Sequence, residues 1–388
     1  MQSEVNLLIL TAGFGSGHIA VAKAIKEQLA INQPEITTEI VDIYKLLNPL
    51  KYKMIYRGYE IFVKLTPGLY NWFYSRKNKE NSSNTRKKLA SRKLLRLKAY
   101  LKNKNPKAIL SVFPECTAII ADYKDQFNSE LILMTCITDL VTKKEWLYKK
   151  NDIYFLGTQE QKQILVDKGY HENSLFVTGI PVRKQFYINK DKICCRRELK
   201  IKNEDKVFML MGGGYGIFPK EESFYRWLLD KGDTILVALT SNNKRIYNIL
   251  YKLKMEYKDR IRLYKFCRQV PEYMKASDYL IGKSGGVTLF EAILSELPII
   301  VYQPRLGQEI ENSKYIIENN IGYISENTEE LKRLIDTIIN SELVNVENQG
   351  IKQIKSIINI ELMSDTIRKA VFFNEKEEKY AKGNNCGN

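Results

Sequence analysis

The chain has few of the residues that build metal centres and disulfide frameworks. Its 388 residues include only two histidines and six cysteines, and no two cysteines form a C-x-x-C pair. Zinc sites need clustered His and Cys ligands, and disulfide-rich domains need many paired cysteines. The sequence therefore predicts neither a zinc site nor a disulfide framework, and its thiols fit a reducing compartment.

Long apolar runs are also missing. A helix that crosses a bilayer needs about 20 predominantly apolar residues, and no stretch of the sequence approaches that length. The first ten residues predict a β-strand containing Glu4, because they lack the basic start and long apolar centre of a secretory signal. We therefore expect a cytoplasmic protein that is soluble or attached to the membrane surface.

What the chain does have is one α/β pattern that occurs twice. Residues 6–11 predict a buried strand, which leads into a Gly-rich turn over residues 12–17 and then into a helix. Residues 207–211 predict a second such strand, followed by a turn containing Gly213 and Gly214 that suits a phosphate. Strand, glycine turn and helix in succession indicate doubly wound α/β domains.

We predict two domains of this kind, because the chain is long enough to build two cores. The first has a basic, aromatic segment over 44–107. The predicted segments are an N-terminal domain over 1–185, a C-terminal domain over 186–350, and over 351–388 a helix crossing back to the first domain and a frayed tail from Asn374.

The turn around Ser284, Gly285 and Gly286 predicts an anion site. It follows a predicted strand over 279–281 and precedes a helix, so free N–H groups and the positive end of a helix dipole meet there. A diphosphate suits such a site. Glu291 lies within the first two helical turns, from which its carboxylate can reach a ribose attached to that diphosphate.

Two further polar residues follow the next predicted strand, 299–302. Gln308 and Glu309 offer hydrogen-bonding groups suited to a sugar on the same rim.

His18 and Asp139 are the candidates for proton transfer. His18 stands where the Gly-rich turn becomes a helix, at the carboxyl end of a strand, where open sheets bind ligands. The alternative is a solvated histidine at a helix start. Asp139 follows the predicted strand 131–137, and its alternative role is a helix N-cap.

The positive charge is concentrated in one part of the chain. Residues 51–107 hold seventeen Lys and Arg against Glu60 and Glu80, a net charge of +15 out of +16 for the whole chain. Aromatic residues alternate with these cations, among them Tyr56, Tyr59, Trp72 and Phe73. Such a segment is typical of an anionic membrane surface, with core helices that have a solvated basic face as the alternative. Nucleic acid is not expected, because no zinc-finger or RNP-type signature is present.

Several of these motifs together resemble one enzyme family, and the resemblance extends from about residue 5 to about residue 340. The chain resembles the processive diacylglycerol glucosyltransferases and monogalactosyldiacylglycerol synthases, of the GT-B class. The motifs that carry the resemblance are Gly17-His18, Phe113-Pro114, Thr138-Asp139 with Trp146, Gly179-Ile180-Pro181, the Gly212 loop and residues 281–312.

The resemblance implies two Rossmann-like domains facing a central cleft, and anomeric inversion as a hexose moves from a UDP-sugar to diacylglycerol or a glycosyldiacylglycerol. It places uracil recognition at Phe266 and Cys267, and makes His18 the first choice of base, with Asp139 second. Where relatives often have a histidine after Thr-Asp, this chain has Lys143 or Lys144, which leaves the acceptor open.

No metal cofactor is expected, because the sequence contains no Asp-x-Asp motif and the helix N-terminus can take its place. Three alternatives stay open: a UDP-sugar epimerase, a GT-B transferase acting on an undecaprenyl-linked or soluble acceptor, and a non-enzymatic basic binding protein. The identity of the hexose, the number of sugars added and the oligomeric state stay open as well.

Overall fold

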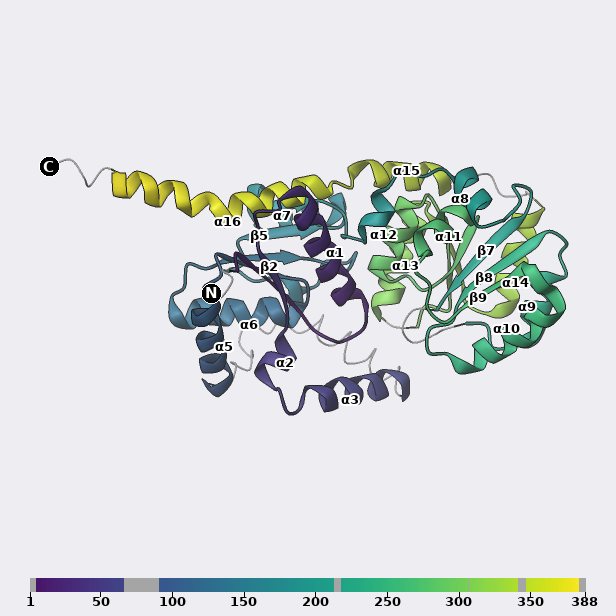
Figure 1. Cartoon of the computed structure of the whole chain (residues 1–388), viewed down its shortest axis with the longest axis horizontal. Coiled ribbons are helices and arrows are strands. Elements are labelled where there is room, and N and C mark those ends of the chain that lie inside the picture. The colour runs from purple at the N-terminus through teal and green to yellow at the C-terminus, as the bar shows by residue number, and fades with distance from the viewer. Residues whose placement is uncertain (1–4, 66–90, 213–217, 306, 341–346, 384–388) are drawn as a thin grey trace. The chain divides into compact units, whose positions relative to one another are not determined.

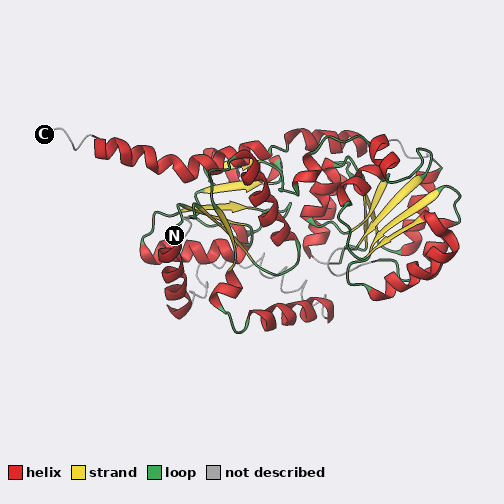
Figure 2. Ribbon diagram, viewed as in Figure 1, coloured by secondary structure: helices red, strands yellow, loops and turns green. Residues whose placement is uncertain are grey.

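The computed structural model describes residues 5–65, 91–212, 218–305, 307–340 and 347–383. The chain divides into two compact units, the first unit consisting of residues 1–184 and 357–388, and the second unit of residues 185–356. Figure 1 traces the chain through each unit, and Figure 2 shows that both consist of strands flanked by helices.

The first unit is built on six parallel strands in the order β2-β1-β3-β4-β5-β6. The inner strand β1 is buried along its whole length because helices cover both faces of the sheet. The strands are β1 (Leu7–Thr11), β2 (Thr38–Asp42), β3 (Ala108–Ser111), β4 (Ile132–Cys136), β5 (Ile153–Leu156) and β6 (Leu175–Val177). The described helices are α1 (Gly17–Asn32), α2 (Ile43–Leu47), α3 (Tyr52–Leu65), α5 (Ser91–Lys104), α6 (Pro114–Phe127), α7 (Gln159–Asp167) and α16 (Ile360–Gly383), with the short helices η1 (Lys144–Trp146) and η2 (Glu172–Ser174).

The second unit has six parallel strands in the order β12-β11-β10-β7-β8-β9. The strands are β7 (Lys206–Met211), β8 (Thr234–Leu239), β9 (Ile261–Tyr264), β10 (Tyr279–Gly282), β11 (Ile299–Tyr302) and β12 (Gly322–Ser325). The described helices are α8 (Lys192–Glu198), α9 (Glu222–Leu229), α10 (Lys244–Tyr257), α11 (Val270–Ala276), α12 (Gly286–Leu294), α13 (Gly307–Glu318), α14 (Thr328–Ile339) and α15 (Glu347–Ile357), with the short helices η3 (Lys184–Tyr187) and η4 (Lys258–Arg260). Of these strands, β12 was not predicted from the sequence.

Each sheet has one point at which the chain reverses its direction of growth. In the first unit the chain runs from β1 to β2 on one side and then crosses to β3 on the other. In the second unit it builds β7, β8 and β9 and then crosses to β10, on the far side of β7. The loops after the two strands at such a point diverge, and open α/β sheets bind ligands in the crevice between them. The sites are therefore expected after β1 and β3, and after β7 and β10.

The C-terminal region differs from the prediction. Instead of one helix and a tail frayed from Asn374, the chain has α15 and α16 with a break between them, and α16 continues to Gly383. Asn359 explains the break. Its Oδ1 accepts a hydrogen bond from the Leu362 N–H at 2.8 Å, as an N-cap residue does, and its own N–H donates to the Thr178 carbonyl at 3.1 Å. This residue therefore starts α16 and fastens it to the first unit.

Among the described helices, none combines the length and apolar composition needed to cross a bilayer.

Candidate functional site

His18 lies at the reversal point of the first sheet. It follows Gly17, the first residue of α1, and its Nδ1 is 2.9 Å from the Val112 carbonyl oxygen, just after β3. The Thr138 hydroxyl, just after β4, is also 2.9 Å from Nδ1. A carbonyl oxygen can only accept a hydrogen bond, so Nδ1 holds the proton in this contact. In the neutral ring Nε2 is then the proton acceptor.

The surroundings of His18 also keep the imidazole neutral. Burial is the largest effect and lowers the pKa of His18 below its usual 6.5. Asp139 and the Val112 hydrogen bond act in the opposite direction and raise the pKa, whereas the positive charge of Lys143 lowers it. A histidine with a lowered pKa is mostly unprotonated at neutral pH, which is the form a general base needs.

Asp139, the second candidate base, is enclosed by protein groups. Its side chain is buried, and its Oδ2 accepts a hydrogen bond from Trp146 Nε1 at 3.3 Å and lies 3.7 Å from Lys143 Nζ. Its main-chain carbonyl accepts a bond from Gln161 Nε2 at 2.8 Å. Since the carboxylate is engaged by neighbouring side chains, the arrangement favours His18 as the group that meets a substrate.

An aromatic cluster fastens α3 to the Gly-rich turn. The Tyr56 hydroxyl donates to Asp42 Oδ1 at 2.6 Å, and a Cβ on Gly13 would lie 2.6 Å from the Tyr56 ring, so a larger residue there would displace that ring. The predicted membrane residues Tyr56 and Tyr59 thus pack toward the turn that precedes His18. The ring of Phe14 lies 4.8 to 5.5 Å, centroid to centroid, from those of Tyr44, Tyr56, Tyr59 and Phe113.

Apolar and basic side chains in and just before α3 are exposed to solvent. Leu50 is 96% exposed and Met54 on α3 is 67% exposed, beside the exposed cations Lys53 and Arg57. Trp72 and Phe73, like Gly213 and Gly214, lie outside the described residues.

The Ser284 turn, residues 284–286, lies at the reversal point of the second sheet. Gly285 is the N-cap of α12 and supplies no side-chain cap, so main-chain N–H groups of Gly286 and the residues after it point out of the first turn. Ser284 itself is fully buried, and its hydroxyl donates to the Glu309 carbonyl at 2.6 Å. Asn312 Nδ2 holds the Ser284 carbonyl at 2.7 Å. The Ser284 side chain is therefore structural, and an anion would meet the backbone of the turn.

Glu309 is held in the same way by its neighbours. Its Oε1 lies 2.5 Å from Lys283 Nζ, and its Oε2 accepts a bond from the Arg305 N–H at 3.2 Å. Gln308 precedes it at the half-buried start of α13. Lys283 was not predicted as a site residue, although its position directly before Ser284 places a cation next to the predicted anion site.

The remaining predicted residues lie at separate places in the second unit. Glu291 is buried on α12, with 7% of its surface exposed. Phe266 is 74% exposed and Cys267 half-buried, and both follow β9, from which β8 and β7 separate β10. Glu291 therefore lies on the helix that begins at the Ser284 turn, whereas Phe266 and Cys267 follow the edge strand β9.

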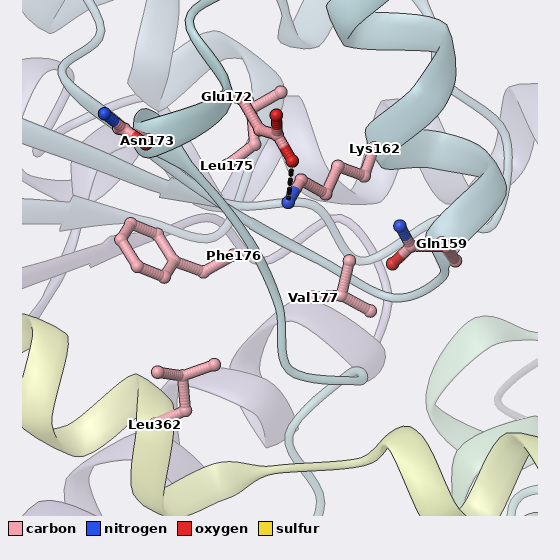
Figure 3. A pocket seen from close by; sticks show the side chains of 8 residues that line it. All are labelled: Gln159, Lys162, Glu172, Asn173, Leu175, Phe176, Val177 and Leu362. Atoms are coloured by element: carbon pink, nitrogen blue, oxygen red, sulfur yellow. Dashed lines mark ion pairs between the residues drawn. The ribbon is translucent and has the colours of Figure 1, made fainter.

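A cavity of about 500 Å³ lies elsewhere, beside the edge strand β6 of the first unit (Figure 3). Lys162 and Glu172 form an ion pair of 2.9 Å on its wall, and Phe176 and Leu362 line its apolar part. None of the predicted site residues lines it. Within the described residues, no group of three or more His, Cys, Asp or Glu side chains is placed to hold a metal ion.

Comparison with known proteins assigns both halves of the chain. Residues 18–182 match the family model of monogalactosyldiacylglycerol (MGDG) synthase, and residues 234–359 match that of the glycosyltransferase family 28 C-terminal domain. The first match lies in the first unit and the second match almost wholly in the second unit. His18, the first residue of the MGDG synthase match, and the Ser284 turn, inside the family 28 match, thus lie in different domains.

Curated and solved relatives cover nearly the whole chain. A processive diacylglycerol beta-glucosyltransferase of Bacillus licheniformis is 25% identical over 361 residues, 92% of each chain. The crystal structure of MurG from Acinetobacter baumannii has a TM-score of 0.61 at 12% identity, covering 94% of this chain and 99% of its own. A UDP-GlcNAc 2-epimerase from Neisseria meningitidis bound to UDP-GlcNAc has a TM-score of 0.56 at 15% identity, covering 94% and 99%.

These likenesses confirm the predicted GT-B fold of two Rossmann-like domains. They also show that one fold accommodates both a MurG protein and an epimerase, so the fold by itself does not decide between transfer and epimerisation. The two domain matches and the curated relatives agree with the predicted glycosyltransferase family.

Proposed function

We propose that this protein is an inverting glycosyltransferase that moves a hexose from a UDP-sugar to diacylglycerol or a glycosyldiacylglycerol at a membrane surface. The substrate class is supported by the similarity to a processive diacylglycerol beta-glucosyltransferase over 92% of both chains. The chemistry is supported by one observation above all, the imidazole of His18 with its Nδ1 at the Val112 carbonyl.

His18 is the general base in this proposal. Nε2 takes the proton of the acceptor hydroxyl as the oxygen attacks the anomeric carbon of the hexose, and the bond from that carbon to the diphosphate breaks. One displacement inverts the anomeric configuration. The lowered pKa of His18 keeps the ring ready to accept the proton at neutral pH.

The second unit holds the donor in this proposal. The diphosphate of UDP lies at the N-terminus of α12, where main-chain N–H groups of the Ser284 turn and Gly286 stabilise the charge that develops as UDP leaves. Lys283 lies directly before the turn, but its ion pair with Glu309 at 2.5 Å offsets its charge, so the main-chain N–H groups stabilise the diphosphate.

The other predicted donor residues complete the site. Glu291 binds the ribose. Gln308 and Glu309 bind the hexose, with Phe266 and Cys267 at the uracil.

Attachment to an anionic membrane surface completes the proposal. The exposed apolar side chains are Leu50, just before α3, and Met54 on α3, and the exposed cations Lys53 and Arg57 lie near them in the chain. Apolar side chains flanked by cations suit the interface of an anionic bilayer. On α5, Leu94, Leu97 and Leu101 face the core while most of its cations are exposed.

The test of function uses UDP-glucose, UDP-galactose and UDP-GlcNAc in turn, over diacylglycerol vesicles with and without anionic lipid. We expect one donor to give a glycosyldiacylglycerol by mass spectrometry, with inverted anomeric configuration by NMR and no loss of activity in a metal chelator. Conversion of the UDP-sugar without lipid product would indicate an epimerase. Product only on a polyprenyl-linked or soluble acceptor would overturn the lipid assignment.

Membrane attachment has its own test. Replacing Lys53 and Arg57 by Glu should weaken sedimentation with anionic vesicles at least tenfold, because each cation near such a surface contributes about 1 kcal/mol. Replacing the exposed Lys252 and Lys254 of α10 by Glu gives the same change of net charge and should have little effect. Equal losses in both variants would show that overall charge, not α3, attracts the membrane.

A further inference from the structure

An ion pair lies buried behind His18. Asp139 and Lys143 are each only 4% exposed, and Oδ2 of the first is 3.7 Å from Nζ of the second. Burying two opposite charges costs solvation free energy that their attraction recovers only with good additional contacts. A buried ion pair often adds little to the stability of a protein, so stability alone does not explain why this pair lies next to the proposed base.

The pair is joined to His18 through neighbouring residues. Asp139 accepts a hydrogen bond from Trp146, whose indole ring lies 6.4 Å from the imidazole, centroid to centroid. Thr138, next in the chain to Asp139, contacts His18 Nδ1 at 2.9 Å. A movement of the carboxylate would therefore move both the residue that contacts the imidazole and the ring beside it.

The two charges act on the imidazole with opposite sign. The carboxylate of Asp139 stabilises the imidazolium, and the ammonium of Lys143 destabilises it. From the other side, the turn after β3 contributes the Val112 carbonyl and the ring of Phe113, 4.9 Å from the imidazole. If Lys143 were uncharged, the carboxylate would act unopposed and would favour a protonated ring, which cannot accept a proton.

We propose that Asp139 and Lys143 are a positioning pair for His18. Asp139 orients the loop that contacts the imidazole, and Lys143 offsets the charge of the carboxylate so that the imidazole stays neutral. Asp139, considered above as a base, here acts through other residues. The catalytic consequence rests on the proposed function, but the effect of the pair on the imidazole does not.

The chain is well suited to a direct test, because it contains only two histidines. His171, which is exposed, can be replaced by Gln so that His18 gives the only imidazole signals in an NMR titration. In this background we expect K143M to raise the pKa of His18 and D139N to lower it. The double variant D139N/K143M should titrate below the parent protein but above D139N, because Asp139 has the larger effect and the loss of the Lys143 charge offsets part of it.

Two controls keep the test decisive. K144M removes the charge of an exposed neighbouring lysine and should leave the titration unchanged, and K143R keeps the charge and should do the same. If K143M does not fold, the double variant still tests the pair, since it leaves no unpaired buried charge. An unchanged pKa in K143M, or a double variant whose pKa is lowered as far as that of D139N, would overturn the proposal.

Activity then separates this inference from the proposed function. If His18 is the base, the pH below which the transfer rate falls should shift together with the pKa of His18 in each variant. If the pKa of His18 shifts and the pH dependence of the rate does not, His18 is not the base, but the positioning pair still stands.

Discussion

Replacing His18 by Asn separates the two nitrogens of the imidazole. The Asn amide nitrogen reaches about the position of Nδ1, so it can keep the hydrogen bond to the Val112 carbonyl, 2.9 Å from Nδ1. The substitution removes only Nε2, the proposed proton acceptor. His18→Ala removes both nitrogens and also leaves the Val112 carbonyl without this donor, at a cost of about 1 to 3 kcal/mol in stability.

The expected loss follows from the role of the residue. A general base contributes about 100- to 10,000-fold, so both variants should lose that factor in kcat for transfer while UDP binding stays within about twofold. The pH dependence has a definite sign. Protonation of His18 removes the base, and its pKa is lowered from 6.5, so wild-type kcat/KM should be flat above that pH and fall only below it.

The assay is UDP release over diacylglycerol vesicles, with UDP binding measured separately by calorimetry. His171→Asn, an exposed histidine on the same unit, is the matched control and should keep full activity. Transfer by His18→Asn at more than about a tenth of the wild-type rate would refute the assignment of the base.

Three further predictions concern UDP binding by Glu291, the stability of the Ser284 turn, and the contact of α3 with the Gly-rich turn. Glu291→Ala should weaken UDP binding by about tenfold or more, as calorimetry would detect, because a hydrogen bond to a charged group is worth about 1.5 to 3 kcal/mol; unchanged affinity would place the ribose elsewhere. Ser284→Ala should lower the free energy of unfolding by about 1 to 3 kcal/mol in denaturant titrations, since its 2.6 Å bond to the Glu309 carbonyl is buried. If that variant loses UDP affinity without losing stability, the hydroxyl touches the ligand instead. Phe14→Ala should slow lipid transfer more than UDP binding, because it detaches α3 from the turn before His18; equal effects on both would argue against this coupling.

The sequence predicted the fold because burial leaves a pattern in each local segment. The apolar strand over 6–11 with its glycine turn and the Ser284 turn with its helix each have a signature that can be recognised alone. The strand β12 was missed because its four residues, Gly-Tyr-Ile-Ser, are too short and mixed for a pattern. The helix break at Asn359 depended on a contact with the Thr178 carbonyl, 181 residues away in the chain.

In the candidate site, too, some features follow from the local sequence and others depend on tertiary contacts. By itself the sequence determined that the chain has two doubly wound halves, a basic segment, a glycine turn before the helix at 286 and a histidine at a strand end, because residue type and spacing are enough to specify these features. Only the tertiary structure decided that His18 Nδ1 faces the Val112 carbonyl, that Lys143 opposes Asp139, and that the Ser284 hydroxyl turns inward. The physical reason is that the partners of His18 and Ser284 lie 94 and 25 residues away in the chain and meet them only when the sheets assemble. Lys143 is only four residues from Asp139, but whether the two side chains meet depends on how the loop between them packs.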